Sequence, residues 1–404
     1  MLFSRRAFLG AASASSALLA STVSGQRIVT PDDPLGVRAD FPAVEKTIFF
    51  DSAYTALSPQ SAINAAQRFI AAKASRPFNV PEMMQESDLV REHFARLVNA
   101  DLDEISLLYA TTDGENIVTR SLDMKPGDNV VIDDLHYRSS YVLYQQLRES
   151  RGVELRTVRH VDGAAPAASF APLVDARTRL VSVSWISHYN GYRQDLQGLA
   201  ELVHAQGGYL YVDAIQGIGI LDLDVKKIDL DFLTSGSYKG LLAGYGVATF
   251  YVRKDLMDRV LPDRWGWTQV AELIDEHSFE LYSDARKFQY ATLSFGSVYY
   301  LNAALEYILD LGVANIERHT VGLAGKLNQG LREQGFEVVT PVANAASIVS
   351  FKHGRSGREV REALQSAGIY INISDTQDYL RVGLAVFNNE PEIDTLLKVT
   401  ADWA

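Results

Sequence analysis

The chain of 404 residues contains no cysteine at all. It can therefore form no disulfide, and it can offer no thiolate, which is the nucleophile that attacks sulfur or selenium most effectively. No other side chain replaces a thiolate well in that role. Any chemistry that needs a protein persulfide is thus excluded before a motif is considered.

Positive charge is also scarce, since 38 lysines and arginines face 50 aspartates and glutamates, giving a formal net charge of -12. A chain of this kind presents no basic surface for nucleic acid or anionic lipid, so no nucleic-acid partner is expected. A glycine-rich Gly-x-Gly-x-x-Gly motif after the early strands is missing too, which argues against a dinucleotide-binding oxidoreductase. We expect a small-molecule substrate and predict no metal site.

The N-terminus lacks an apolar run long enough to span a membrane. It has instead the paired arginines Arg5 and Arg6, followed by small and weakly apolar residues as far as Ala20. This arrangement resembles a twin-arginine export signal, which carries proteins that are already folded. We expect a signal at residues 1–25 and a mature chain that begins near Gln26 and is periplasmic or secreted, with no membrane contact. An amphipathic N-terminal helix is the alternative.

A chain that is 47% apolar at this length exceeds what one hydrophobic core usually organises. We predict an N-terminal arm and large domain over residues 26–255 and a smaller C-terminal domain over residues 256–404. Continuous apolar runs alternate with helical patterns in the large domain, which is typical of an α/β fold with a mostly parallel sheet covered on both faces. The expected strands are 47–51, 105–109, 129–133, 153–158, 179–185, 209–213, 231–235 and 246–252.

Helices are expected at 58–74 and 86–98, before most of these strands, and at 195–206 between two of them. The smaller domain is predicted to be α+β. Its expected elements are a long helix from about residue 297, a strand at 347–351, a helix at 357–367 and a strand at 379–386.

Three polar residues stand where chemistry is expected. Asp213 follows a buried strand, Gln216 comes three residues later, and Lys239 lies in a turn after the next strand, flanked by small residues. Ligands of open α/β sheets bind beyond the carboxyl ends of the strands. A carboxylate there can pair with a protonated pyridine nitrogen, and a desolvated lysine can form an imine. Taken alone, the aspartate could instead cap a turn and the lysine could lie on the surface.

Two further segments complete this pattern. Thr111 and Thr112 follow a strand and open a helical run, so their hydroxyls and the free backbone amides can bind a phosphate. Tyr137 follows another strand end and could stack on an aromatic ring, although His136 competes for that role.

Together these segments resemble the class V aminotransferase family of fold-type I pyridoxal 5'-phosphate enzymes, from about Phe49 to the C-terminus. By this resemblance Lys239 would bind the cofactor covalently, Asp213 would pair with its pyridine nitrogen, and Gln216 would contact its phenolic oxygen. The phosphate would be held by Thr111 and Thr112.

The resemblance implies further roles. Tyr238 would join the phosphate site, Tyr137 would stack on the cofactor, and His188 or Asn190 would lie near the substrate. Arg381, in a segment similar to the family's C-terminal signature, would bind the substrate α-carboxylate. Phe288 to Thr292 resembles the segment that passes a threonine, here Thr292, to the neighbouring subunit's phosphate. A homodimer with shared active sites is therefore implied.

The absent cysteine excludes the desulfurase mechanism of this family, so we expect chemistry that needs only the cofactor and a base. Lys239 could remove the α-proton of an amino acid or a peptidic amino acid. Epimerisation, C–S lyase-like elimination and transamination all follow that step, and tailoring of a peptide such as a siderophore is a further option. Epimerisation needs an acid on the far face, for which Tyr137, His136 and His188 are candidates. A catalytically silent binding protein is the non-enzyme alternative.

Overall fold

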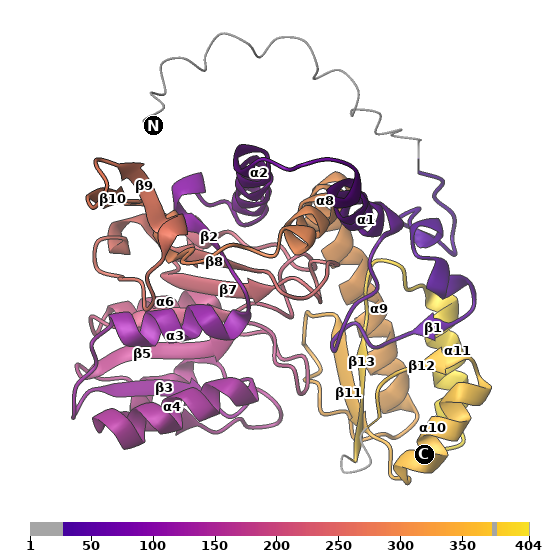
Figure 1. Cartoon of the computed structure of the whole chain (residues 1–404). Coiled ribbons are helices and arrows are strands. Elements are labelled where there is room, and N and C mark those ends of the chain that lie inside the picture. Colours follow the sequence, from indigo (N-terminus) through magenta and orange to yellow (C-terminus); the bar gives the residue numbers. More distant parts are fainter. Residues whose placement is uncertain (1–26, 374–377, 404) are drawn as a thin grey trace.

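Seven strands form the sheet of the larger domain, in the order β2-β8-β7-β6-β5-β3-β4 (Figure 1). All neighbouring pairs from β7 to β4 are parallel, whereas β8 runs antiparallel to both of its neighbours. The strands are β2 (Ile105–Leu108), β3 (Asn129–Asp133), β4 (Glu154–Val158), β5 (Thr178–Ser184), β6 (Tyr209–Asp213), β7 (Phe232–Gly236) and β8 (Ala248–Val252). The predicted mostly parallel α/β sheet is confirmed.

This computed structural model describes residues 27–373 and 378–403. The export signal predicted at residues 1–25 lies outside the described residues. Within the described part, no helix has the length and apolarity that a membrane crossing requires. The same residues contain no group of three or more histidines and carboxylates placed to hold a metal ion.

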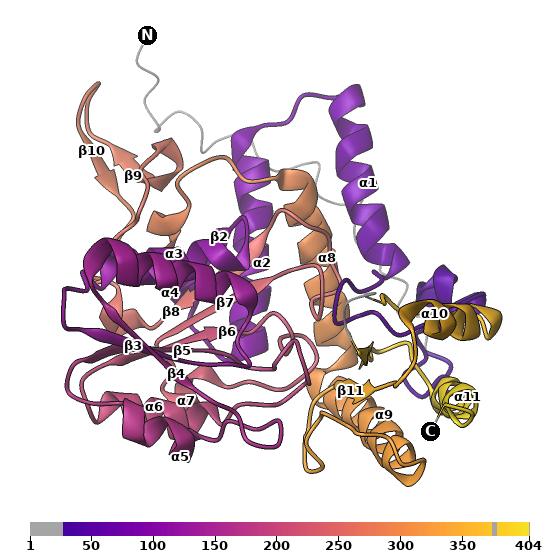
Figure 2. The ribbon, with the colours of Figure 1, turned by 90° about the horizontal axis from the view of Figure 1, so that it is seen from below.

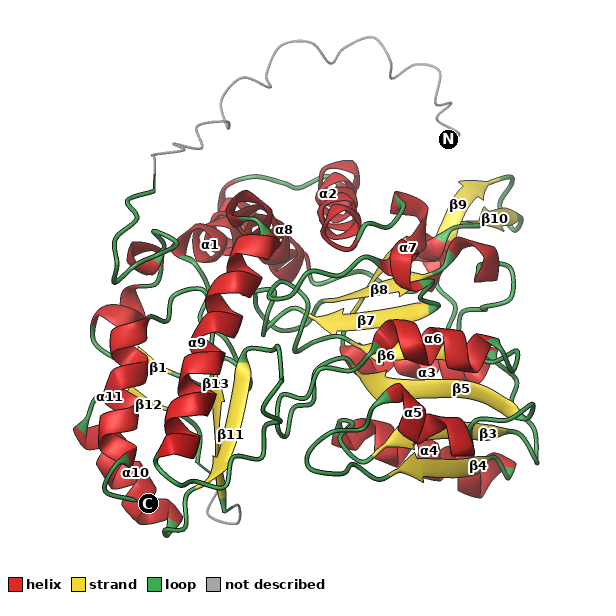
Figure 3. Cartoon of the chain, turned by 180° about the vertical axis from the view of Figure 1, so that it is seen from behind, coloured by secondary structure: helices red, strands yellow, loops and turns green. Residues whose placement is uncertain are grey.

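Helices cover both faces of the sheet because consecutive strand residues point to opposite sides. Val131 packs into one buried cluster, and its neighbours Val130 and Ile132 pack into the other. On one face lie α3 (Thr111–Ser121) and α4 (Arg138–Arg151). On the other lie α5 (Ala167–Phe170), α6 (Leu196–His204) and α7 (Val225–Ile228), as Figures 2 and 3 show.

The smaller domain packs its helices against an antiparallel pair of strands, β11 (Ile348–Lys352) and β13 (Tyr379–Gly383). Its helices are α9 (Val313–Glu333), α10 (Gly357–Ser366) and α11 (Glu390–Thr400). Between the domains, α8 (Phe295–Leu311) packs against α1 (Gln60–Ser75) and α2 (Val80–Val98). A hairpin of β9 (Val270–Leu273) and β10 (Phe279–Leu281) projects from the large domain (Figure 1). Short 3-10 helices lie at Arg38–Asp40, Pro42–Glu45, Leu102–Glu104, Ala171–Leu173, Lys254–Leu256, Trp267–Gln269 and Ala285–Phe288.

The N-terminal arm, which the sequence grouped with the larger domain, contacts both domains, because Val37, Phe41 and Val44 pack into the same buried cluster as Val131. Strand β1 (Ile48–Phe49) pairs in parallel with β12 (Ile369–Tyr370). Conversely, the boundary predicted at residue 255 falls inside the second buried cluster of the large domain, which extends to Phe288. The ring of Phe288 lies 5.3 Å from that of Phe250, edge to face. Segments far apart in sequence thus share each core.

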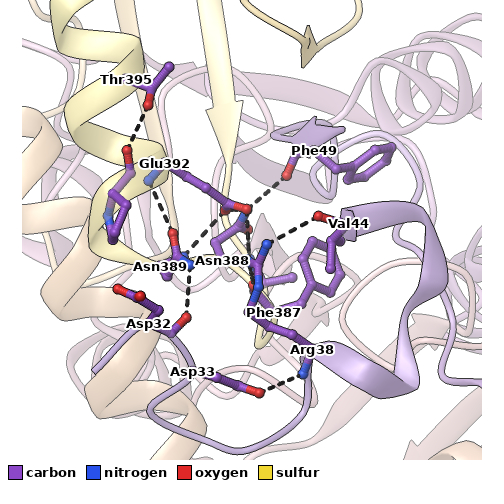
Figure 4. A network of polar contacts seen from close by, with 12 residues as sticks. Asp32, Asp33, Arg38, Val44, Phe49, Phe387, Asn388, Asn389, Glu392 and Thr395 are labelled. Carbon is purple, nitrogen blue, oxygen red and sulfur yellow. Dashed lines mark hydrogen bonds and ion pairs between the residues drawn. The ribbon is translucent and has the colours of Figure 1, made fainter. Parts of the chain in front are cut away.

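Figure 4 shows a polar network that ties this arm to the start of α11. The Arg38 guanidinium donates to the carbonyl of Phe387 at 2.5 Å and forms an ion pair with Glu392 at 2.8 Å. The Asn388 amide donates to the carbonyl of Phe49 and to Glu392, both at 2.9 Å. Asn389 caps α11 by accepting from the Glu392 amide at 3.0 Å. We call these residues the arm network: Arg38, Phe49, Phe387, Asn388, Asn389 and Glu392. Each donor named here has its acceptor within the network.

Two helices begin at other residues than the sequence predicted, because their first residues are set by the capping residue. Asn79 accepts from the Glu82 amide at 2.8 Å, so α2 begins at Val80 and not at the predicted residue 86. Helix α1 begins at Gln60, with Pro59 in the cap position in place of the predicted Ser58.

Candidate active site

The polar residues that the sequence singled out meet at one edge of the large sheet. The carboxyl ends of β2, β3, β5, β6 and β7 share this edge because these strands run in the same direction. A cavity of about 270 Å³ lies there. Its walls are formed by Tyr109, Ala110, Thr111, Thr112, Glu115, Tyr137, Ser139, Asp213, Ile215, Gly236, Tyr238, Lys239, Tyr245, Gly246 and Val247.

A second hollow, of about 640 Å³, lies between α3 and α4 and shares Thr112 and Ser139 with the first. Among the described residues that line it there is no lysine, histidine or carboxylate. The groups that can move protons or form an imine converge on the smaller cavity. We therefore place the active site there.

Lys239 and Asp213 are both buried in its wall. Burial disfavours a charged amine, and it lowers the pKa of Lys239 to about 8, although the nearby Asp213 carboxylate acts against this shift. Burial also raises the pKa of Asp213, opposed first by the charge of His136 and then by the amide of Ile215, which donates to the carboxylate at 3.1 Å. A lysine with this pKa is partly neutral near physiological pH, the form in which an amine can act as a nucleophile or a base.

The N-terminus of α3 forms a cradle of backbone and hydroxyl groups. The Gly236 amide donates to the Thr111 hydroxyl at 3.0 Å, which brings the end of β7 against the first turn of the helix. A methyl group on Gly236 would lie 2.9 Å from the side chain of Ile215 and 3.2 Å from those of Thr111 and Tyr238, so a larger residue would have to displace these side chains. Thr112 lines the cavity one residue further along.

Two rings stand over the lysine side of the cavity. Tyr137 is 44% exposed, and its ring contacts that of His188 edge to face at 5.2 Å. The Lys239 ammonium lies 5.8 Å from the centre of the Tyr137 ring. His136, the competing candidate, is buried behind Tyr137 and does not line the cavity.

The His188 side chain is held as a neutral imidazole. Burial, and after it the cations Arg381 and Lys239, lower its pKa to about 3. Its buried Nδ1 atom has no hydrogen-bond partner among the described residues. An unpartnered buried nitrogen is costly, so it marks a position where a ligand atom is expected.

Arg381 approaches from β13 of the smaller domain and donates to the carbonyl of His188 at 2.8 Å. It also acts on Asp51, a residue that sequence reasoning missed. Burial raises the pKa of Asp51 to about 6, and the Arg381 charge opposes that rise. The signal was available, since Asp51 ends a predicted strand just as Asp213 does.

Tyr238 and Gln216 are two further residues that the sequence predicted for the site. Tyr238 lines the cavity and stacks on Tyr245 at 4.2 Å. Gln216 is buried three residues after Asp213, and its amide donates to the carbonyl of Ala53 at 2.8 Å.

Asn190 is not brought to the site. It is fully buried, and its amide donates to the carbonyls of Gly163 at 2.7 Å and Val339 at 3.3 Å while its oxygen accepts from Tyr192. The side chain of Asn190 thus joins the two domains and has no atom left to face a substrate, whereas His188 contacts the ring of Tyr137, which lines the cavity.

Thr292 is exposed and does not line the cavity of its own chain. Its carbonyl accepts from the hydroxyl of Tyr109, which does line it, at 2.9 Å. Glu115 and Tyr245 also line the cavity and were missed by the sequence analysis.

Comparison with known families decides the identity of the fold. A model of the class V aminotransferases matches residues 48–396. The chain belongs to the class V aminotransferase family. A probable cysteine desulfurase of Methanothermobacter thermautotrophicus is 27% identical over 386 residues, covering 89% of this chain and 95% of that protein. A cysteine desulfurase of Pectobacterium carotovorum is 27% identical over 390 residues, with the same coverage.

Solved structures of the class V fold agree with the architecture. The cysteine desulfurase of Thermococcus onnurineus NA1 superposes with a TM-score of 0.81 at 24% identity, covering 93% of this chain and 99% of that one. The cystine C–S lyase C-DES superposes with a TM-score of 0.83 at 22% identity, covering 90% of this chain and all of that one. The class V family depends on pyridoxal phosphate, and this enzyme is therefore a pyridoxal phosphate enzyme.

The cavity fits this cofactor. The amides and hydroxyls at the start of α3 suit a phosphate, and the hydrogen bond from Gly236 holds the Thr111 hydroxyl at this position. The unpartnered Nδ1 of His188 offers a hydrogen bond to a bound group. Lys239 would hold the cofactor covalently, with Asp213 at its pyridine nitrogen.

Proposed function

We propose that this class V enzyme removes the α-proton of an amino acid, free or peptidic, and expels a substituent from its β-carbon as a C–S lyase does. The observation that carries the proposal is a buried Lys239, whose pKa burial lowers to about 8, in a chain without any cysteine. Relatives are named cysteine desulfurases, so sulfur-containing amino acids are the first substrates to test. Without a protein thiol, the sulfur must leave on a fragment of the substrate.

Lys239 is suited to move the proton. Pyridoxal phosphate, when bound, withdraws electrons from the α-carbon. A lysine with a pKa of about 8 is partly neutral at physiological pH, and only a neutral amine accepts a proton. The α-proton passes to Nζ, the electron pair that it leaves forms a double bond to the β-carbon, and the β-substituent departs with its own bonding pair. The leaving group can then take the proton from Nζ.

Arg381 and His188 are suited to hold the substrate. A guanidinium binds a carboxylate through two parallel N–H groups, so we assign the substrate α-carboxylate to Arg381. His188 receives Arg381 at its carbonyl and carries the unpartnered Nδ1 in the same place. A neutral imidazole there adds a hydrogen bond without adding charge.

Epimerisation is the second candidate, and the position of Tyr137 favours it. The tyrosine ring faces the Lys239 amine across 5.8 Å, so its hydroxyl group could return a proton from the far face. His188 is a weaker candidate for this acid. Its pKa of about 3 means that the ring is neutral near pH 7 and carries a single hydrogen.

The decisive experiment is to incubate the purified holoenzyme in deuterated water with L- and D-amino acids that carry β-thiol, β-disulfide or β-thioether groups. Elimination predicts a keto acid, ammonia and a released sulfur fragment. Deuterium at the α-carbon with inverted configuration and no fragment would establish epimerisation in its place. A keto acid that retains the sulfur would indicate transamination.

We also propose that two copies of the enzyme share their active sites. Thr292 supports this, because it is exposed, lies outside the cavity of its own chain and is held beside it by Tyr109. Analytical ultracentrifugation should give roughly twice the mass of one chain. A monomer at every concentration tested would contradict the proposal.

Export by the twin-arginine route is proposed from Arg5 and Arg6 alone. Replacing both by lysine should retain the full-length protein in the cytoplasm. Sequencing of the mature N-terminus of the unmodified protein should place cleavage near Gln26, and an uncleaved cytoplasmic protein would refute export.

A further inference from the structure

A buried polar cluster lies behind Tyr137, and one of its members, Glu115, also lines the cavity. It consists of Glu115 from α3, His136 from the loop after β3, Ser140 from α4 and Ser182 from β5. All four side chains are at most 3% exposed. Four elements of the large domain therefore meet at polar atoms, where apolar packing would be the ordinary choice.

Glu115 is the final acceptor of the hydrogen bonds in this cluster. The Ser140 hydroxyl donates to one oxygen of Glu115 at 2.8 Å, and the Ser182 hydroxyl donates to the other at 2.9 Å. Because Ser182 has only one hydrogen and gives it to Glu115, its oxygen must accept from the Nε2–H of His136, which lies 2.9 Å away. Glu115 therefore fixes a hydrogen on Nε2 of the imidazole.

The other nitrogen of the same ring reaches the active site. The backbone amide of Tyr137 donates to Nδ1 of His136 at 2.8 Å, and the Ser184 hydroxyl lies 3.0 Å from the same atom. Tyr137 caps the start of α4 and presents its ring to the cavity. A carboxylate in α3 is thus linked through two side chains to the position of the ring that faces Lys239.

Carboxylates surround the ring of His136. The titratable groups that face His136 are Glu115 from α3, Asp133 from β3 and Asp213 from β6, with His188 on the cavity side. The three carboxylates raise the pKa of His136 against the effect of burial. Because Nδ1 accepts from the Tyr137 amide, the ring in this arrangement is neutral and carries its single hydrogen on Nε2.

We propose that Glu115 is a positioning residue of the reaction: through Ser182 it holds the hydrogen of His136 on Nε2, so that Nδ1 accepts from the Tyr137 amide and sets the place of the Tyr137 ring. The inference rests on the role proposed above for Tyr137. It adds a residue that does not itself carry out the chemistry. Glutamine at this position can donate a hydrogen to Ser182, which glutamate cannot do, and the tautomer of His136 is then no longer fixed.

The test is Glu115→Gln in the holoenzyme labelled with ¹⁵N-histidine. Glutamine keeps the shape and can still bond both serines, but its amide can donate to Ser182, whose own hydrogen can then turn to Nε2 of His136. The His136 nitrogen resonances, assigned by their loss in His136→Asn, should show the Nε2–H tautomer in the unmodified enzyme and a shift toward the Nδ1–H tautomer in the variant. The cofactor absorption should change in parallel, because Nδ1 no longer accepts from the Tyr137 amide.

The matched control is Glu104→Gln, which alters a glutamate that is equally buried and bonded to the Lys254 backbone but outside the cavity. It should lower the melting temperature without changing the His136 tautomer. If Glu115→Gln fails to fold, Ser182→Ala breaks the same connection and should change the ¹⁵N shift of Nε2. An unchanged His136 tautomer in a folded Glu115→Gln enzyme would overturn the proposal. Since no substrate is present, this outcome is separate from whether the enzyme eliminates or epimerises.

Discussion

The arm network and the active-site cavity are both built from buried polar side chains, yet they are organised in opposite ways. In the arm network, Arg38 reaches two carbonyls and Glu392, and Asn388 shares that same carboxylate. In the cavity, His188 has a buried nitrogen without a partner among the described residues, and Lys239 is buried with a pKa lowered to about 8. One cluster is closed on itself, and the other leaves its groups available to a ligand.

This difference separates stability from function within one fold. Closed hydrogen bonds hold the arm onto α11, so loss of a partner there leaves buried groups unsatisfied and destabilises the native state. Open groups destabilise the protein slightly while they wait for a ligand, and they recover that free energy on binding. Substitutions in the two regions should therefore affect different measurements.

The largest effect is expected for Lys239→Ala. Loss of the base and of the covalent link should reduce kcat/KM by about 10⁴-fold or more and abolish the absorption band of the lysine-bound cofactor. Lys287→Ala is the control, since Lys287 is also 8% exposed and has its pKa lowered by burial, but it donates to the Met257 carbonyl outside the cavity. It should lower stability and leave the absorption band intact. An unchanged band in Lys239→Ala would remove the assignment.

Arg381→Lys should show that the cavity depends on geometry as well as charge. Lysine keeps the positive charge but cannot bind a carboxylate through two parallel N–H groups, so KM should rise about 10- to 100-fold with a smaller change in kcat. Arg91→Lys is the matched control, because Arg91 is buried and donates to the carbonyls of Ile105 and Leu102. Steady-state kinetics should find its KM unchanged. Equal KM values for the two variants would contradict the clamp.

The sequence predicted the part of this site that depends on local pattern. Asp213 and Lys239 could be found because apolar runs mark the strands, and the ends of parallel strands meet at one edge. Glu115 could not, since a glutamate four residues after Thr111 reads as an exposed helical position until α4 and β5 cover it. Asn190 and His188 are two residues apart in one loop, and only the packing of the chain near Gly163 and Val339 decides that Asn190 bonds to the backbone while His188 contacts Tyr137.

Glu392→Gln tests the arm network from within. The ion pair with Arg38 and the bond from Asn388 lose the charge that strengthens them, so the free energy of unfolding should fall by about 2 kcal/mol. Glu390→Gln, two residues earlier on α11, removes an exposed partner of Lys326. It should change the free energy of unfolding by less than about 0.5 kcal/mol. Denaturant unfolding measures both. A change of kcat/KM in Glu392→Gln at full folding would show that the two regions are coupled.

The smallest effect concerns Asp51, which joins the two regions because it lies two residues beyond β1 and faces Arg381. Burial raises its pKa from 3.8 to about 6, so the folded protein binds this proton more tightly than the unfolded chain does. Between about pH 4 and pH 6 the native state must release it, and stability falls as the pH rises through that window.

Asp133 also has a pKa raised by burial to about 6 and adds a similar slope, so the prediction is a difference between proteins. Between pH 4 and pH 6 the free energy of unfolding should fall for both proteins. The fall should be about 1 to 2 kcal/mol smaller for Asp51→Asn than for the unmodified protein. Unfolding in denaturant at the two pH values measures this, and parallel curves would mean that Arg381 already keeps Asp51 ionised. In that case Asp51 would be a paired group like those of the arm network. Arg381 would then be the first residue, coming from the arm, that belongs to the open cavity.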